Sequence, residues 1–531
     1  MSLQWLLSRV IPEDTAALGR AILRVQNVYC QIGERFDELL PDELTFAGMY
    51  EATGRGAIPP LLLALVTVFQ MLEKVPDRLA AECVVTRIDW KYALHLPLTY
   101  TGFHFTDLAA FRLRLLTHGE ERLLFDQLLV RLKALGVFQK RGKMRTDSTH
   151  ILGVVERLSQ LELVAESLRM AVEAVSAVAA QWAQQALPET FWQVYSERQS
   201  EYGLSQKQVE SRLARVGKDA FWFLAQVDHS APVFVQHLAE VETLRQVLAQ
   251  QFPGGPHAPA VRKRPSGKEV IESPHEPEAR RGAKRGQGWI GYKFQVTESC
   301  DAHQPHLITD LEPTGALDND SPQLPHIQAR LVERDLIPAE QQVDQAYMSA
   351  ENLVQSAQLG ITLMGIPLAD TQGPEGFRQA DFQVHEEARQ AICPAGHTSR
   401  LWRERHSPGQ ANPAIQVRFA AQTCQDCPFF GRCTRSRQGR SLTLHPYRTA
   451  LAARRAQAKT EAFRERLHLR AGIEGTISEL VRAHGLRRAR YRRLAKLRLQ
   501  AYFTAIAINL KRLIRWWTRP QPALDHRALR A

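Results

Sequence analysis

The chain has 531 residues and a formal net charge of +12, which allows two or three domains and favours a polyanionic partner such as DNA. It carries no basic-then-apolar leader pattern and no uncharged apolar run of 18 residues, so we expect a soluble, intracellular protein without a membrane segment. Of its seven cysteines, four lie between Cys393 and Cys433, which favours reduced thiols or metal ligands over a disulfide framework.

Residues 1–138 are predicted to be helical. Thr106 is the expected N-cap of a helix through Leu108, and a second helix, from about residue 120 to residue 134, is expected to stop at Gly136. A helical region ahead of a second domain either reads DNA or serves as a packing or dimerisation platform. The sequence leaves both interpretations open.

The pattern changes at residues 143–150, KMRTDSTH, which predict a strand that places Asp147 among small hydroxyl residues. Taken alone, an Asp followed by Ser and Thr is more typical of a turn or cap than of a ligand. Residues 155–255 return to apolar spacing of three and four and predict a helical insertion. A linker rich in Pro, Gly and basic residues follows at 253–268.

Strands return in the second half of the chain. Tyr292, Phe294 and Val296 alternate with polar or small residues, which is typical of a strand, and residues 307–311 and 339–344 predict two more. Asp344 therefore falls at the C-terminal end of a strand, just before a helix. Ligands gather at that edge of α/β sheets.

Residues 367–446 interrupt this pattern with a cysteine-bearing insertion. Its cysteines follow the pattern Cys-x2-Cys-x5-Cys after an earlier Cys-x3-His group. This arrangement predicts a structural zinc ion, with His397 as an alternative ligand, while buried reduced thiols are the other interpretation. The predicted zinc ligands are Cys393, Cys424, Cys427 and Cys433.

Residues 470–500 are predicted to form one long helix. Arg470 and Glu474 are four residues apart and share a face. Gly472 and Gly475 flank the acid, and because each costs a helix about 1 kcal/mol relative to alanine, close approach of another backbone or ligand is expected there. Glu474 is interpreted as a metal-binding carboxylate; a solvated Arg–Glu pair is the alternative.

The same stretch ends in a basic run. Between Val481 and Gln500 there are eight Arg and Lys residues and no acid. Such a run repels itself unless phosphates neutralise it, so it predicts a DNA-binding surface. The residues assigned to it are Arg487, Arg488, Arg490, Arg492, Arg493 and Lys496. The apolar stripe that follows, up to Trp517, is interpreted as core.

Three acids thus stand in order, 197 and 130 residues apart: Asp147, Asp344 and Glu474. The motifs RTDSTHI, VDQAYMS and RAGIEGTISE around them, with EARRGAKRGQGWIGYKF and GLRRARYRRLAKLRLQAYFTAIAINLKRL, resemble the DDE transposases of bacterial insertion sequences. The resemblance implies an α/β, RNase H-like mixed sheet with flanking helices at 139–531. It also implies an all-α N-terminal domain at 1–138 and the two insertions at 155–255 and 367–446.

The resemblance further implies metal-dependent cleavage at insertion-sequence ends and transfer of the 3′-OH ends into target DNA. Two Mg²⁺ ions, with Mn²⁺ as a substitute, would be held by the three acids, and Arg470 would orient Glu474 or touch the scissile phosphate. A homodimer bridging two DNA ends and a cytoplasmic, nucleoid-associated location in a bacterium are also implied.

One related branch of this family carries a tyrosine and a lysine around the last acid. Here those positions hold Leu467 and Val481, so their roles are not carried over, and His484, Arg487 or Arg488 would contact phosphate instead. Two other functions remain open. One is an RNase H-like nuclease without strand transfer, and the other is a non-catalytic, zinc-containing DNA-binding protein.

Overall fold

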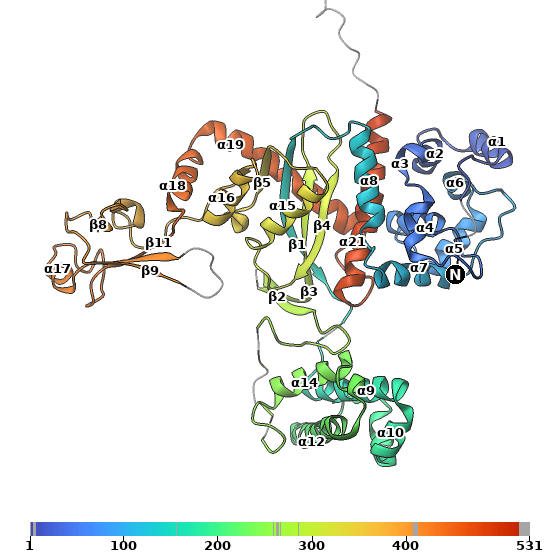
Figure 1. Cartoon of the computed structure of the whole chain (residues 1–531), viewed down its shortest axis with the longest axis horizontal. Helices are drawn as coiled ribbons and strands as arrows, with labels where there is room; N and C mark the ends of the chain where they lie inside the picture. The colour runs from blue at the N-terminus through green and yellow to red at the C-terminus, as the bar shows by residue number, and fades with distance from the viewer. Residues whose placement is uncertain are drawn as a thin grey trace, which may run out of the picture.

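The computed structural model describes residues 2–519 except 4–6, 156, 259, 262–264, 266, 285 and 407–412. The predicted linker at 253–268 lies partly outside the described residues. A central sheet has the N-terminal helices on one side, a helical insertion below it and a small, separate β unit on the other side (Figure 1).

The central sheet is mixed. Strand β1 is its middle strand, antiparallel to β3 and parallel to β5. β2 (Arg280–Lys284) pairs with the first residues of β3, and β4 pairs with the remainder. From β4 the order is β4 (Ile308–Gly315), β3 (Gln287–Ser299), β1 (Lys143–Leu152), β5 (Glu340–Val343) and β6 (Thr362–Met364). This order confirms the predicted RNase H-like sheet.

The alternating strand of the sequence is β3, in which Tyr292, Phe294 and Val296 are fully buried. Helices follow two other strands as predicted: α15 (Gln323–Glu333) after β4, and α16 (Ala350–Gln358) after β5. The side chain of Ser349 accepts a hydrogen bond from the amide of Asn352 and caps α16. A short 3-10 turn, η2 (Gln345–Tyr347), separates β5 from α16.

Helix α21 (Leu494–Trp517) joins the sheet to the N-terminal helices. It lies against β4 on one side and against α4, α7 and α8 on the other (Figure 1). Its predicted stripe, including Phe503, Ile506 and Leu510, is buried in one core shared by both regions. The helices before the sheet are α1 (Glu13–Ile22), α2 (Val28–Glu34), α3 (Phe36–Leu39), η1 (Glu43–Met49), α4 (Pro60–Glu73), α5 (Asp77–Thr86), α6 (Ile88–Ala93), α7 (Thr106–Thr117) and α8 (Leu123–Ala134).

The stretch between β1 and β2 is helical, as its periodicity predicted, and has an apolar core of its own. Ser159 with Glu162 caps its first helix, and Ser205 with Gln208 caps its longest one, each as a capping box. Its helices are α9 (Gln160–Val178), α10 (Ala180–Ala186), α11 (Glu189–Tyr195), α12 (Gln206–Ser230), α13 (Val233–Gln236) and α14 (Ala239–Gln251).

A small β unit, residues 383–444, follows β6 and stands apart from the central sheet (Figure 1). We call it the cysteine-bearing unit. Six buried side chains form its core. Its elements are β7 (Gln383–His385), β8 (Gln390–Ile392), β9 (Leu401–Arg405), β10 (Ala414–Arg418), α17 (Ala421–Gln425) and β11 (Ser441–Leu444); the turn η3 (Gln379–Asp381) precedes it, and α18 (Arg448–Gln457) and α19 (Glu461–Leu467) lead back to the sheet.

The prediction of one helix over residues 470–500 is wrong. The chain forms η4 (His468–Gly472), α20 (Ile473–Ser478) and a π turn, η5 (Glu479–Ala483), and then leaves helical geometry until α21. Gly485 takes a left-handed φ of +71°, and the Leu486 amide donates to the carbonyl of Leu480. Periodicity cannot reveal this break, because the next residues pair with the end of β1 instead: Leu152 exchanges backbone hydrogen bonds with Arg487 and Ala489.

Two smaller predictions also need correction. Thr106 is the first residue of α7 and Phe105 is its cap residue. The next helix begins at Leu123 rather than near residue 120, although Gly136 follows its end in a left-handed conformation, as predicted. None of the helices within the described part of the chain is both long and apolar enough to cross a membrane.

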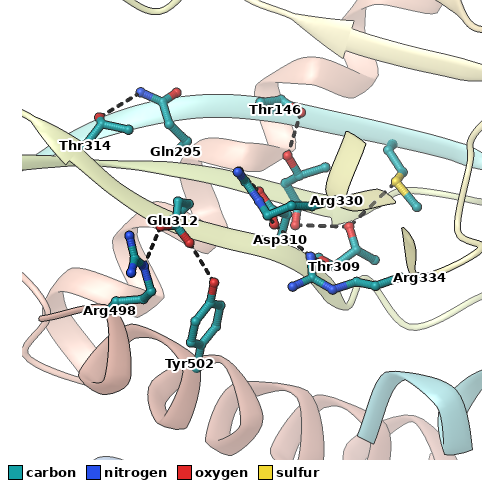
Figure 2. A network of polar contacts seen from close by, with 12 residues as sticks. Thr146, Gln295, Thr309, Asp310, Glu312, Thr314, Arg330, Arg334, Arg498 and Tyr502 are labelled. Carbon is teal, nitrogen blue, oxygen red and sulfur yellow. Dashed lines mark hydrogen bonds and ion pairs between the residues drawn. The ribbon is translucent and has the colours of Figure 1, made fainter. Parts of the chain in front are cut away.

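Buried carboxylates on β4 serve the fold. Asp310 is fully buried and accepts from Arg330 and Arg334, both extending from α15 or its end, at 2.7 and 2.8 Å (Figure 2). Glu312 accepts from Arg498 and Tyr502 of α21, each at 2.6 Å (Figure 2). These pairs tie both helices to β4, and because their charges are neutralised they are not free to bind a cation.

Candidate active site

Asp147 lies on β1, in the middle of the sheet, and its side chain is 19% exposed. One carboxylate oxygen accepts from the backbone amide of Ser148 at 2.7 Å. The other lies 3.4 Å from Nη1 of Arg470. The strand thus presents a largely buried acid with one cationic neighbour.

Asp344 lies directly after β5, the strand parallel to β1. The pairing of Thr146 with Val343 brings Asp147, within β1, to a position next to Asp344, which directly follows β5. The Asp344 side chain accepts from the amide of Gln345 at 2.7 Å and so caps the turn η2. β1 continues past Asp147 to Leu152, so this acid lies within its strand, whereas Asp344 comes directly after its own.

The pKa of Asp147 responds to its burial and to the nearby charge of Asp344. Burial raises the pKa of Asp147, and the charge of Asp344 raises it further. The Ser148 amide and the cations Arg470 and Lys284 act in the opposite direction without reversing the rise. A partly desolvated pair of carboxylates that favours a proton also favours a cation.

Glu474 lies on α20, exposed to solvent and one turn beyond Arg470. The close approach expected at the two flanking glycines is present at Gly472, where a Cβ would stand 1.9 Å from Nη1 of Arg145. It is absent at Gly475, where a Cβ would meet nothing within 4 Å. In the described part of the chain, no three His, Cys, Asp or Glu side chains already form a metal-ion site. Asp147 thus lies beside Arg470 and Asp344, and the metal-binding role of Glu474 stays a prediction.

A polar network behind the two aspartates was not foreseen from the sequence. The fully buried Tyr347 donates its hydroxyl to Oε1 of Gln295. Nε2 of Gln295 and Oγ of Ser148 each donate to Asp320 at 3.2 Å, and Nζ of Lys293 lies 3.6 Å from the same carboxylate. The network joins β1 to β3 and to the turn after β5.

This network reaches both aspartates through their neighbours in the chain. Ser148 follows Asp147, and the Tyr347 amide donates to the carbonyl of Asp344 at 3.1 Å. Burial raises the pKa of Tyr347 well above its ordinary value, and the charges of Asp320, Asp147 and Asp344 add to this. The VDQAYMS motif was the one sequence signal for Tyr347; nothing local marked Gln295 or Asp320.

The basic segment splits into two groups. Arg487 donates to Oγ1 of Thr149 and to the carbonyl of His150, both on β1, and Arg490 donates to the carbonyl of Val75. The other four predicted DNA-binding side chains are exposed: Arg488, Arg492, Arg493 and Lys496. Arg493 lies 3.5 Å from Glu240 of the helical insertion. Two arginines thus hold the loop, and four side chains face solvent.

The structure changes the role that the sequence suggested for His484, and it adds Lys284 to the residues near the site. His484 was an alternative phosphate contact, but it is 5% exposed and its Nδ1 lies 3.0 Å from the carbonyl of Met71, so it serves packing. Lys284, on the β2–β3 hairpin, was not singled out, yet it is near enough for its charge to lower the pKa of Asp147. Beside it on the same hairpin, Trp289 packs on His150 with ring centroids 4.8 Å apart.

The four cysteines predicted as zinc ligands come together in the cysteine-bearing unit. They line one cavity of about 30 Å³, which we call the cysteine pocket, together with His397 and several phenylalanines. Each is partly exposed and none forms a disulfide. Within the described residues, these side chains are not arranged as the ligands of a metal ion.

Comparison with known families defines the class of protein. Residues 392–514 match a family model described as a transposase DDE domain, and residues 24–114 match one described as a transposase domain (DUF772). The first segment spans the cysteines, Arg470, Glu474 and the basic segment; Asp147 and Asp344 lie outside both. Together the matches support a DDE-class transposase of an insertion element. No curated protein and no solved structure gives a significant match to the chain.

Proposed function

We propose that this transposase cleaves DNA at the ends of its insertion element and joins the freed 3′-OH ends to target DNA. The observation that supports this most directly is the pair Asp147 and Asp344, which follow the paired residues Thr146 and Val343 of the parallel strands β1 and β5. The burial and mutual repulsion of these acids raise the pKa of Asp147, as expected where a cation is to be bound.

The donor set fits magnesium. Mg²⁺ prefers hard oxygen ligands and keeps several waters, so a few carboxylates and a substrate phosphate suffice. Asp147, Asp344 and Glu474 would hold two Mg²⁺ or Mn²⁺ ions, with Asp147 common to both. When bound, such a pair of ions activates the attacking oxygen and stabilises the leaving oxygen of a phosphodiester. Glu474 is exposed, so it is free to turn toward DNA-bound ions.

The cations of this region have separate roles in the proposal. Arg470 holds Asp147 in position and contacts the scissile phosphate beside it. Lys284, near the same carboxylate, contributes positive charge from the β2–β3 hairpin. Arg488, Arg492, Arg493 and Lys496 contact the phosphate backbone farther along the duplex.

We also propose which region contacts the DNA ends, how many chains act together and where in the cell the protein works. The helical region 1–138, which shares one core with the RNase H-like region 139–531, contacts the element's ends. Two chains pair in the complex that bridges both ends, because both must be cut and joined in concert. The protein acts at the bacterial nucleoid in the cytoplasm.

The experiment is a cleavage and strand-transfer assay with Asp147→Asn, Asp344→Asn and Glu474→Gln. Each variant should lose cleavage while retaining end binding in a gel shift, and Glu333→Gln, which changes a 60% exposed carboxylate on α15, should behave as the parent. A variant that retains near-parental cleavage removes its residue from the site. Cleavage without joined donor–target product would identify a nuclease without strand transfer instead.

A further inference from the structure

We infer that the cysteine-bearing unit contains a structural zinc site with four thiolate ligands and that this ion, rather than an apolar core, holds the unit together. The site is independent of the proposed transposition chemistry. The ligands are Cys393, Cys424, Cys427 and Cys433.

Two tight turns deliver the thiols to one point. In the first, the Cys393 amide donates to the carbonyl of His397 at 2.9 Å and the Gly396 amide donates back to the carbonyl of Cys393 at 2.8 Å. Gly396 has a φ of +83°, which favours glycine. This turn fixes Cys393 at the end of β8 and uses the backbone of His397 for the turn itself.

The second turn follows α17. The Cys427 amide lies 3.4 Å from the carbonyl of Cys424, and the Cys433 amide donates to the carbonyl of Phe429 at 2.9 Å. The backbone amide of Arg440 donates to Sγ of Cys424 at 3.4 Å. An amide hydrogen bond to sulfur favours the thiolate, which is the form that binds metal. The Cys-x2-Cys spacing is the one usual for zinc turns.

The pocket between the two turns suits one ion. Its volume of about 30 Å³ leaves room for a single small ion between the thiols. Phe377, Phe419, Phe429 and Phe430 line it and limit access of water. Within the described residues the thiols are not arranged as ligands, so binding an ion would require them to turn toward one another.

The charges around the pocket agree with this assignment. The four thiols line the same pocket as the Arg440 side chain. Four thiolates with one Zn²⁺ carry a net charge of −2, which Arg440 and Arg432, whose guanidinium lies 5.7 Å from the Phe377 ring, would partly offset.

The cysteine-bearing unit has a small apolar core, which a bound metal ion would reinforce. Its core consists of five of its own buried residues, Ala391, Val417, Phe419, Leu442 and Leu444, together with Phe382 directly before it. Small units with so few buried apolar groups usually depend on metals or disulfides, and here the cysteines are free. His445, directly after the unit, lies 2.6 Å from Glu351 of α16. A bound ion would thus supply cohesion that packing does not.

The test is the metal content of the full-length protein, purified without chelator and measured by elemental mass spectrometry. About one zinc per chain is expected, with release on titration of the thiols by a mercurial reagent. Cys424→Ser with Cys427→Ser should remove the zinc, whereas Cys30→Ser with Cys83→Ser, at buried cysteines of the N-terminal helices, should leave it in place. Chelation should expose residues 383–444 to limited proteolysis before the rest of the chain.

Several results would overturn the inference. Parental protein with less than about a tenth of a zinc per chain, even after refolding with zinc, would exclude the site, and stoichiometric iron would exclude zinc as its metal. Full zinc in the Cys424→Ser, Cys427→Ser protein would exclude these ligands. Loss of zinc in His397→Ala but not in Cys393→Ser would replace one thiol by the imidazole. These readouts do not depend on transposition activity, so either proposal can fail alone.

Discussion

The guanidinium of Arg470 lies 3.4 Å from the carboxylate of Asp147, 323 residues earlier in the chain, so the arginine's structural partner is the first acid and not the nearby Glu474. The contact joins η4 to the middle strand of the sheet. It places a fixed positive charge beside the carboxylate that the proposed chemistry uses most.

Arg470→Ala should reduce metal-dependent cleavage by roughly 10- to 100-fold, the range typical of residues that orient a metal ligand. Because burial and Asp344 already raise the pKa of Asp147 and Arg470 opposes them, the variant should also need a higher pH for half-maximal cleavage. A pH–rate series measures both effects. Arg470→Lys should recover part of the activity, and an unshifted pH profile in Arg470→Ala would contradict the electrostatic role.

Asp147→Asn should stabilise the metal-free protein at neutral pH. The raised pKa of Asp147 means that the folded chain binds its proton more tightly than the unfolded chain does. Stability therefore falls as pH rises from the unfolded value, about 3.9, through the raised one. At pH 7.5 in EDTA the melting temperature of Asp147→Asn should exceed that of the parent. Added Mg²⁺ should raise the melting temperature of the parent only; a lower melting temperature for the variant in EDTA would contradict this.

Asp320→Asn should weaken cleavage without weakening DNA binding. The carboxylate accepts from Ser148 and Gln295, so its loss loosens the positions of both aspartates. We expect a roughly 10- to 100-fold loss of cleavage and a higher Mg²⁺ requirement, measured by titrating the metal. Asp318→Asn, at a more exposed carboxylate two residues away, is the matched control. Equal metal requirements for parent and Asp320→Asn would show that the network is only structural.

Combined Arg488→Ala, Arg492→Ala and Lys496→Ala changes should reduce the salt dependence of DNA binding. Each lost phosphate contact lowers the slope of log K against log salt by about 0.9, and these side chains are exposed, so the melting temperature should not change. Arg490→Ala should instead lower the melting temperature, because its guanidinium donates to the carbonyl of Val75. An unchanged salt slope in the triple variant would assign these residues elsewhere.

Glu479→Gln should lower stability at neutral pH by about 2 kcal/mol, the usual loss for hydrogen bonds to a charged group. Burial raises the pKa of Glu479, but Arg512 and Lys511 of α21 outweigh it and hold this pKa below its ordinary value. The stabilisation is therefore complete above the unfolded value, about 4.3, and is lost as pH falls through the lowered one. Urea unfolding should reveal a larger difference between parent and variant at pH 7 than at pH 3.

Local signals determined much of this protein from its sequence alone. Alternation in β3 and the stripe of α21 predicted their elements correctly, because apolar periodicity acts over a few residues. The motifs around Asp147, Asp344 and Glu474 indicated a resemblance to transposases, and the cysteine spacing predicted a zinc site. These inferences need no knowledge of distant contacts.

Only the tertiary structure decided which residues meet. The basic segment leaves helical geometry because its backbone pairs with Leu152 of β1, a partner more than 300 residues away that no local pattern reveals. The same holds for Arg470 on Asp147 and for the Gln295 and Asp320 network behind the aspartates. Strand pairing and side-chain packing join segments far apart in the chain, so the partners of each charge are set by the folded sheet and not by sequence neighbours.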